Sequence, residues 1–356
     1  MDVSGGGKTK VELDGQNVLD SYSVLYQAGL RKQGEGTLTI TDETDDRGNK
    51  ITATKSGTSG SLTAKGAGGN GAAGIGGSAA EGTKNITIEG YATVDATGGG
   101  YAAGIGGGGA DNGFSGSAYN ITIQGHSNVT ASAYDGAAIG SGSAYGGDYG
   151  GSAKGIVICD HAKVAARSDT GHGAAIGAAA GDNGKDTEAE VTIGTAGATA
   201  EQEDVHVTAT GLYGSAIGSG IKDTKVTIQG HSTIRMESRK NSTAIGSNYG
   251  NVEVNIKDNV TIDTDNASAT AEPDHAGSSI GGGDIRGDSN RKVVVNIDGG
   301  TNGKVKIGDY IQIFGKYGAI SATEVNIGDN VLLKMKPWES SDAKLSLIHI
   351  SEPTRR

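Results

Sequence analysis

A short phrase built around isoleucine and glycine recurs along the whole chain and constrains its fold more than any other feature. The phrase reads AAGIGG, YAAGIGGGG, AAIGSG, AAIGAA, SAIGSG, TAIGSN and SSIGGG. Its isoleucines are separated by 28 residues (Ile217 to Ile245) to 41 residues (Ile176 to Ile217). A unit of this length that returns so often indicates a repeat architecture, in which each unit packs on the next.

One copy of the phrase also has the G-x-G-x-x-G spacing of a dinucleotide-binding loop, at Gly104, Gly106 and Gly109. Such a loop binds pyrophosphate where a strand precedes it and a helix follows, because the helix N-terminus supplies the N–H donors. No segment with the 3.6-residue period of a helix follows here. We therefore assign these glycines to the fold rather than to a nucleotide.

Two further segments in each repeat alternate apolar and polar residues, which predicts strands with one buried face. NITIQG and NVTASA are one such pair, with Ile121, Ile123, Val129 and Ala131 expected to face inward. With the isoleucine-glycine phrase they give three short strands per repeat. We expect each strand to pair with its equivalent one coil away, about 4.8 Å along the axis. The predicted fold is all-β: a right-handed parallel β-helix (β-solenoid) of about nine coils.

The repeat is regular over residues 61–335 and irregular in residues 1–60. In the irregular part we expect KVELDG and SYSVLYQAG to form one coil, and TLTIT with SLTAKG to form the next. The inner residue of the second strand becomes larger along the chain. As equivalents of Ala96 and Ala131 we align Met236, Ile262, Ile307 and Leu333.

Both ends of the chain depart from the repeat. Residues 345–356, LSLIHISEPTRR, resemble the translation of a sequencing-library adapter, which makes them a non-native tail on a metagenomic fragment. The start, MDVSGGGKTKVELDG, lacks the basic and apolar runs of a secretion signal, and no stretch approaches the ~20 apolar residues of a membrane span. We expect a segment without membrane insertion, either intracellular or a fragment whose signal and anchor lie elsewhere.

Composition excludes several classes of protein. Glycine supplies 64 of 356 residues but proline only three, which argues against collagen, and the apolar alternation argues against a disordered linker. The single cysteine excludes an internal disulfide framework. A formal charge of −11 without a Lys/Arg run argues against a nucleic-acid partner and suits a secreted protein.

The third strand presents alanine and glycine on its outward side, as at Ala102 and Gly104. This pattern indicates close approach of another group, either a loop that folds over the strand or a ligand. A column of aromatic residues precedes the isoleucines and is expected to line one edge of this alanine-glycine ribbon. These rings either stack on sugar faces, as a ligand-binding site, or stack on each other in a turn; they are Tyr101, Tyr134, His172, Tyr213, His275 and Tyr317.

Two other columns have structural interpretations that we favour over functional ones. Tyr91, His126, His161 and His231 occupy matching turn positions, where a stack of rings is favoured over a transition metal shared by two histidines. The outward column of the first strand is neutral and polar, and cross-strand contacts are favoured over ice binding. This column contains Thr87, Thr122, Val157, Thr192, Thr227, Asn255, Asn296 and Asn326.

Acidic loops offer oxygen ligands for Ca²⁺, the one cofactor that the sequence suggests. The first candidate site is Asp42, Glu43, Asp45 and Asp46, in DETDDRGN; the second, in DTDN, is Asp263, Asp265 and Asn266. Neither has the spacing of an EF-hand or of a repeated Ca²⁺-binding nonapeptide, and a solvated acidic loop is the alternative.

Catalysis by a β-helix enzyme would need carboxylates on neighbouring coils. The outward column of the second strand, aligned by the repeat, has no two carboxylates side by side, so the sequence argues against an enzyme. The column reads Asp95, Thr130, Ala165, Thr208, Arg235, Thr261, Lys306 and Leu332.

From about residue 8 to residue 335 the chain resembles the glycine-rich GIGGG repeat regions of large bacterial surface proteins. GSLTAKGAGGNGAAGIGG and NITIEGYATVDATGGGYAAGIGGGG carry the resemblance. It implies a parallel β-helix at the bacterial cell surface or secreted from the cell, adhesive or carbohydrate-binding, with a glycan or a host or cell-wall surface as partner. A structural stalk without ligand, and a polysaccharide lyase or hydrolase, are the alternatives.

Overall fold

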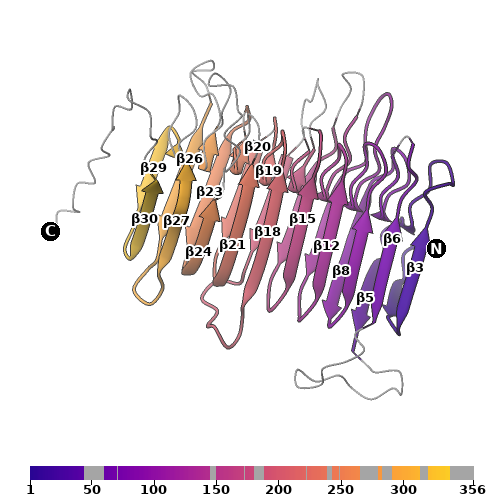
Figure 1. Cartoon of the computed structure of the whole chain (residues 1–356), viewed down its shortest axis with the longest axis horizontal. Coiled ribbons are helices and arrows are strands. Elements are labelled where there is room, and N and C mark those ends of the chain that lie inside the picture. The colour runs from indigo at the N-terminus through magenta and orange to yellow at the C-terminus, as the bar shows by residue number, and fades with distance from the viewer. Residues whose placement is uncertain are drawn as a thin grey trace.

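The computed structural model describes most of the chain as strands and turns. The described residues are 1–43, 60–69, 71–144, 150–171, 173–179, 188–221, 223–238, 243–247, 249–264, 280–282, 291–312 and 320–336. They contain thirty strands and no helix. Figure 1 shows the strands side by side along the long axis, from β3 at one end to β30 at the other.

The strands form three parallel sheets of ten, and each coil contributes one strand to each sheet. Sheet A contains the isoleucine-glycine phrases: β1 (Asp2–Val3), β4 (Leu30–Lys32), β7 (Ile75–Gly76), β10 (Ile105–Gly106), β13 (Ile139–Gly140), β16 (Ile176–Ala178), β19 (Ile217–Ser219), β22 (Ile245–Ser247), β25 (Ile280–Gly282) and β28 (Ile320–Ser321).

Sheet B contains the first strands of the predicted repeats: β2 (Lys8–Glu12), β5 (Thr37–Asp42), β8 (Thr83–Gly90), β11 (Ala118–Ile123), β14 (Ala153–Ile158), β17 (Glu188–Ile193), β20 (Asp223–Ile228), β23 (Val252–Lys257), β26 (Val293–Asp298) and β29 (Glu324–Ile327). Sheet C contains the second: β3 (Gln16–Asp20), β6 (Ser61–Lys65), β9 (Thr93–Thr97), β12 (Asn128–Ala133), β15 (Lys163–Ser168), β18 (Val205–Gly211), β21 (His231–Ser238), β24 (Asn259–Thr264), β27 (Val305–Gln312) and β30 (Val331–Lys336).

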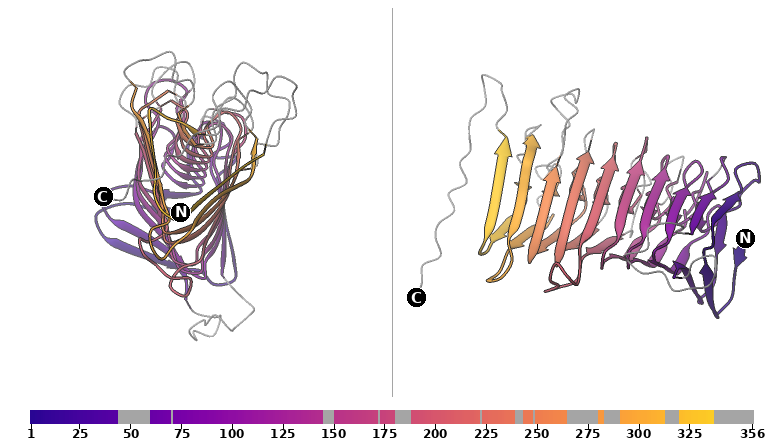
Figure 2. Two further views of the ribbon diagram at one scale, coloured as in Figure 1. Left: turned by 90° about the vertical axis from the view of Figure 1, so that its left-hand side faces the viewer. Right: turned by 60° about the horizontal axis from the view of Figure 1, so that its bottom comes forward.

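This arrangement confirms the predicted parallel β-helix with three strands per coil, and the described residues make ten coils where about nine were expected. Equivalent strands pair in register, as Ile105 does with Ile75 on one side and with Ile139 on the other. The coils therefore superpose when the molecule is viewed along its axis (Figure 2).

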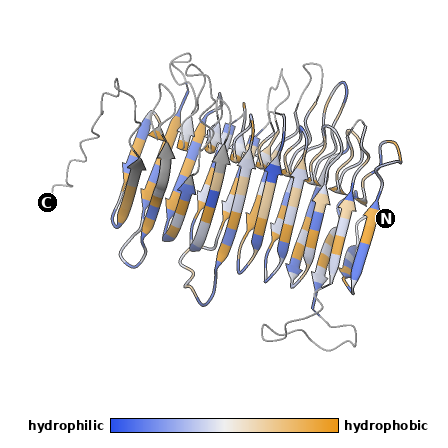
Figure 3. Ribbon diagram, viewed as in Figure 1, coloured by the Kyte–Doolittle hydropathy of each residue, from blue (hydrophilic) through white to orange (hydrophobic). Residues whose placement is uncertain are grey.

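The core is a set of aliphatic columns that run through the coils. Ile105 points inward from sheet A, Ile121 and Ile123 from sheet B, and Val129 and Ala131 from sheet C, and all five are buried. Apolar and polar bands accordingly alternate along the strands (Figure 3). Successive coils are close together, so an inward side chain packs on its equivalents in the coils above and below. The hydrophobic core is therefore a set of columns along the axis of the β-helix.

The register of the last coils differs from the predicted alignment by two residues. Ile234 pairs with Ile262, and Ile262 pairs with Ile307, so only Met236 continues the column of Ala96 and Ala131. Val260 instead occupies the buried position near the start of the strand that Ser232 holds one coil earlier. Alternation has a period of two, so a slip of two residues keeps the same face inward and is not visible in the sequence.

The expectation for the first coil was partly wrong. KVELDG contributes the end of β2, but the other predicted piece, SYSVLYQAG, is a loop, and sheet C begins with QNVLD in β3. Val18 is exposed because it faces outward on β3, where it pairs with Thr63, and Tyr22 and Leu25 are exposed in the loop that follows.

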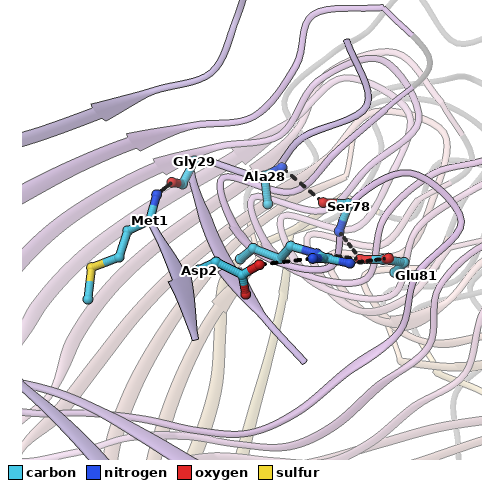
Figure 4. A network of polar contacts seen from close by, with 7 residues as sticks. Met1, Asp2, Ala28, Gly29, Ser78 and Glu81 are labelled. Atoms are coloured by element: carbon cyan, nitrogen blue, oxygen red, sulfur yellow. Dashed lines mark hydrogen bonds and ion pairs between the residues drawn. The ribbon is translucent and has the colours of Figure 1, made fainter. Parts of the chain in front are cut away.

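A network of charged groups ties the first three coils together (Figure 4). Arg31 binds both carboxylate oxygens of Glu81, through Nε at 2.9 Å and Nη2 at 2.6 Å, and its Nη1 donates to Asp2 Oδ2 at 2.9 Å. The Ser78 N–H also donates to Glu81 Oε2, at 3.2 Å. The hydrogen bonds to Glu81 hold the pKa of Arg31 above its usual value. A bidentate pair of this kind fixes orientation as well as charge.

Each isoleucine-glycine phrase is a tight arc rather than a flat strand. In the fourth coil the Ala103 N–H donates to the Gly107 carbonyl at 2.9 Å, which closes the arc around the inward Ile105. Gly106 follows with φ +144°, and a Cβ atom at this position would lie 1.7 Å from the carbonyl oxygen of Gly140 in the next coil. The phrase therefore requires glycine both for its backbone angle and for the close approach of the next coil.

We expect Gly106→Ala to lower the free energy of unfolding by about 3 kcal/mol or more. The alanine would be strained at this positive φ angle, and its Cβ atom would overlap the backbone of the next coil. Thermal unfolding followed by circular dichroism measures the change. Gly6→Ala is the matched control, since a Cβ there meets nothing within 4 Å. A loss no larger than that of the control would contradict the role given to Gly106.

Candidate functional site

The alanine-glycine ribbon is not an open surface. Ala102, Ala138 and Ala175 are completely buried. Ala138 and Ala175 belong to the hydrophobic core, so they do not face outward as predicted, whereas Ala102 lies against the backbone of Gly71 and Gly136 in the neighbouring coils. The Gly109 N–H donates to the Gly71 carbonyl at 2.7 Å, which joins the loops of successive coils. Of the two interpretations of this glycine pattern, loop packing and ligand binding, the structure supports loop packing.

The predicted aromatic edge has three members in the described structure. Tyr134 is 57 % exposed, whereas Tyr101 and Tyr213 are half-buried. Tyr134 does not continue the column of Tyr101: the Asp135 N–H donates to the Gly100 carbonyl at 3.1 Å, which places Asp135 beside Tyr101. The other three predicted members lie outside the described residues: His172, His275 and Tyr317.

The sequence reasoning missed three exposed aromatic residues, of which two lie in connections from sheet A to sheet B and one lies on a strand of sheet B. Phe114 is 70 % exposed, Tyr249 is 64 % exposed, and Tyr119 on β11 is 38 % exposed. Simple alternation counted back from Ile121 would turn Tyr119 inward. Asn120, however, has a left-handed backbone angle, φ 54°, which interrupts the alternation of inward and outward residues in β11. As a result, Tyr119 and Asn120 both face solvent.

The second ring column forms the expected turn stack over three coils. The rings of Tyr91 and His126 have centroids 4.9 Å apart and planes 12° apart, and those of His126 and His161 are 4.6 Å and 30° apart. Burial, with a smaller contribution from His161, lowers the pKa of His126. No group of three histidine, cysteine or acidic side chains in the described part of the chain is placed to hold a metal ion.

His231 is separated from this stack by the insertion after Gly194, which carries a buried carboxylate. Glu203 accepts hydrogen bonds from three backbone N–H groups: Thr195 at 2.8 Å, His231 at 3.1 Å and Asp160 at 3.3 Å. These donors belong to three successive coils, and His231 is the first residue of β21. The Glu203 side chain is almost fully buried. Its carboxylate accepts the hydrogen bonds that carbonyl groups of a shorter turn would otherwise accept.

His231 and His206 flank one carboxylate beside the insertion. The Asp204 Oδ2 atom lies 3.1 Å from His206 Nε2, and its Oδ1 atom lies 3.5 Å from His231 Nδ1. Both histidines are partly exposed, so such contacts stabilise the turn only weakly.

The first candidate Ca²⁺ site is divided between described and undescribed residues. Asp42 is buried and accepts a hydrogen bond from the Gly60 N–H, while Glu43 pairs with Lys10 at 2.9 Å. Both carboxylates therefore have protein partners. Asp45 and Asp46 of this site, with Asp265 and Asn266 of the second, lie outside the described residues.

The outward face of sheet B carries ladders of hydrogen bonds and ion pairs between coils. Asn326 donates to Asn296 and Asn296 donates to Asn255, each through Nδ2 at 2.8 Å, which supports the structural interpretation of this column. Lys225 pairs with Glu253 at 3.5 Å, and a hydrogen bond from Asn255, followed by this lysine, lowers the pKa of Glu253.

Carboxylates on neighbouring strands have partners of their own. Glu188 and Asp223 are register partners on sheet B, but Glu188 pairs with Lys154, and Asp223 accepts hydrogen bonds from the backbone N–H and the side-chain amide of Asn251. The corrected register of sheet C places Asp263 beside Arg235, where the sequence alignment had placed Thr261. The carboxylates of Glu188 and Asp223 are therefore held by contacts with protein groups.

Within the described ranges the chain forms no apolar helix long enough to cross a membrane. No protein-family model, curated protein or solved structure matches this chain.

We expect Glu203→Gln to lower the free energy of unfolding by about 2 kcal/mol, because an amide is a weaker acceptor and turns one donor toward N–H groups. Urea unfolding measures the difference. Glu201→Gln, on the exposed part of the same loop, is the control and should have little effect. Equal stability of the two variants would contradict a structural role for Glu203.

We expect His126→Tyr to reduce the loss of stability on acidification. Because the pKa of His126 is lowered in the folded chain, the unfolded chain binds the proton more readily. The stability contributed by the neutral ring is therefore present above about pH 6.5 and is lost as pH falls below it. Melting temperatures from pH 7.5 to pH 5 measure the effect.

Tyr91→Phe serves as the control for this substitution, since it keeps the stack and the titrating ring. Its melting temperature should fall with pH as in the parent chain. If His126→Tyr also follows the parent curve, the histidine does not contribute to the pH dependence.

Proposed function

We propose that this chain is a secreted or cell-surface β-helix repeat region that binds carbohydrate, with a glycan or a host or cell-wall surface as partner. The observation that carries the proposal is the exposure of aromatic rings on both sides of sheet A: Tyr134 on the side of sheet C, and Phe114 and Tyr249 on the side of sheet B. Aliphatic side chains fill the interior, and these rings are not members of the hydrophobic core.

Carbohydrate fits the exposed rings better than other partners. An aromatic ring with polar neighbours matches a pyranose, which has apolar C–H faces and a rim of hydroxyl groups. The formal charge of −11 disfavours polyanions. The resemblance of the repeats to bacterial surface proteins supports an extracellular setting.

A structural stalk without ligand is the second candidate. It is favoured by the ladders of sheet B, in which Asn255, Asn296 and Asn326 bind one another rather than solvent partners. Ten coils at about 4.8 Å each extend roughly 45 Å, enough to hold other domains away from a surface. A polysaccharide lyase or hydrolase is less well supported, because the neighbouring carboxylates Glu188 and Asp223 are bound to protein groups.

A glycan and mucin binding screen on residues 1–344 tests the proposal. We expect binding in the parent chain and its reduction when Tyr101, Tyr134 and Tyr213 are replaced together by alanine, provided that the variant keeps the parent circular dichroism spectrum. Release of reducing ends or of unsaturated products in the same incubations would indicate an enzyme instead. A folded parent chain that binds nothing on the array would support the stalk.

A further inference from the structure

We propose that Tyr119 is the stacking ring of a subsite for a neutral pyranose on the outward face of sheet B. This inference rests on the proposed carbohydrate binding and names where and what the chain binds. The site is distinct from the predicted column of Tyr101, Tyr134 and Tyr213, which precedes sheet A on the other side.

Tyr119 occupies the centre of a polar platform made by three coils. Its register partners are Lys84 in the preceding coil and Lys154 in the following coil. Both lysines are partly exposed, and each forms an ion pair, Lys84 with Glu35 and Lys154 with Glu188. The ring is thus bordered on both sides by lysine side chains that are held in place by carboxylates.

Side-chain amides extend the platform next to the ring. Asn120 Nδ2 donates to Asn85 Oδ1 at 3.0 Å, and Asn85 Nδ2 donates to the Glu35 carbonyl at 2.9 Å. These bonds order two exposed amides beside Tyr119, and each amide retains further donor and acceptor capacity for hydroxyl groups. Both asparagines have left-handed φ angles, 59° and 54°, and at Asn120 this turns Tyr119 outward.

The charges of the platform select a neutral sugar. The two lysines are offset by Glu35 and Glu188, so the patch has no net charge from these groups, and the acidic chain as a whole repels anionic glycans. A pyranose with equatorial substituents exposes flat C–H faces to a ring. The ligand class is therefore a neutral β-linked polysaccharide of glucose, xylose or mannose type.

Phe114 supplies a second exposed ring on the same edge. It lies five residues before Tyr119, so their Cα atoms are at most about 18 Å apart. Two rings within this distance suit a chain of a few sugars rather than a monosaccharide. The subsite at Tyr119 and the ring of Phe114 would then act on one oligosaccharide.

Affinity electrophoresis in gels containing hydroxyethyl cellulose, xylan or galactomannan tests the proposal. We expect the parent chain to be retarded by at least one of these polymers. Tyr119→Ala should weaken the interaction about fivefold to tenfold, as loss of one stacking contact does. Tyr119→Phe should retain most of it. Tyr22→Ala is the matched control, because it removes an exposed ring from the loop between β3 and β4, to which no binding role is given.

The outcomes separate this inference from the general function. Retardation that is unchanged in Tyr119→Ala but lost in Tyr134→Ala would overturn the Tyr119 subsite and leave carbohydrate binding intact. Retardation by hyaluronan or alginate alone would overturn the neutral ligand class. A folded parent chain that no glycan retards would overturn both proposals. Melting temperatures of all variants verify that they are folded.

Discussion

The structure depends on the close approach of successive isoleucine-glycine arcs. Gly106 and its equivalents face the carbonyl group of the next coil at a distance that no side chain tolerates, with backbone angles that other residues rarely adopt. This contact determines the spacing of sheet A, and sheets B and C follow it in register. Glycine here is therefore a requirement of stacking, which explains why the phrase recurs while the surrounding residues vary.

Variation is accommodated in the turns, where side chains replace missing backbone partners. The insertion after Gly194 is accompanied by Glu203, whose carboxylate binds the N–H groups of three coils. Asn85 and Asn120 adopt left-handed angles and bind each other through their amides. Local departures of this kind leave the stack intact because side chains bind backbone groups in the neighbouring coils, as Glu203 and Asn85 do.

Alternation predicted which residues of a regular strand face inward, as for Ile121, Ile123, Val129 and Ala131, which are all buried. It did not predict register, since a slip of two residues keeps the same face; the column of Ala96 was extended to Ile262 instead of stopping at Met236. It also failed at Tyr119, where the left-handed Asn120 reverses the alternation. The exposure of the Tyr119 ring therefore could not be predicted from the two-residue alternation alone.

The sequence by itself determined the repeat, the three strands per coil and the inward columns, because stacking of identical units forces like residues into like environments. Only the tertiary structure decided which surfaces are open. Ala138 and Ala175 of the alanine-glycine ribbon belong to the hydrophobic core, and backbone of neighbouring coils lies against Ala102. These placements depend on contacts between coils that no local pattern encodes. The surface that we propose for binding is the outward face of sheet B around Tyr119, whose exposure follows from the left-handed Asn120.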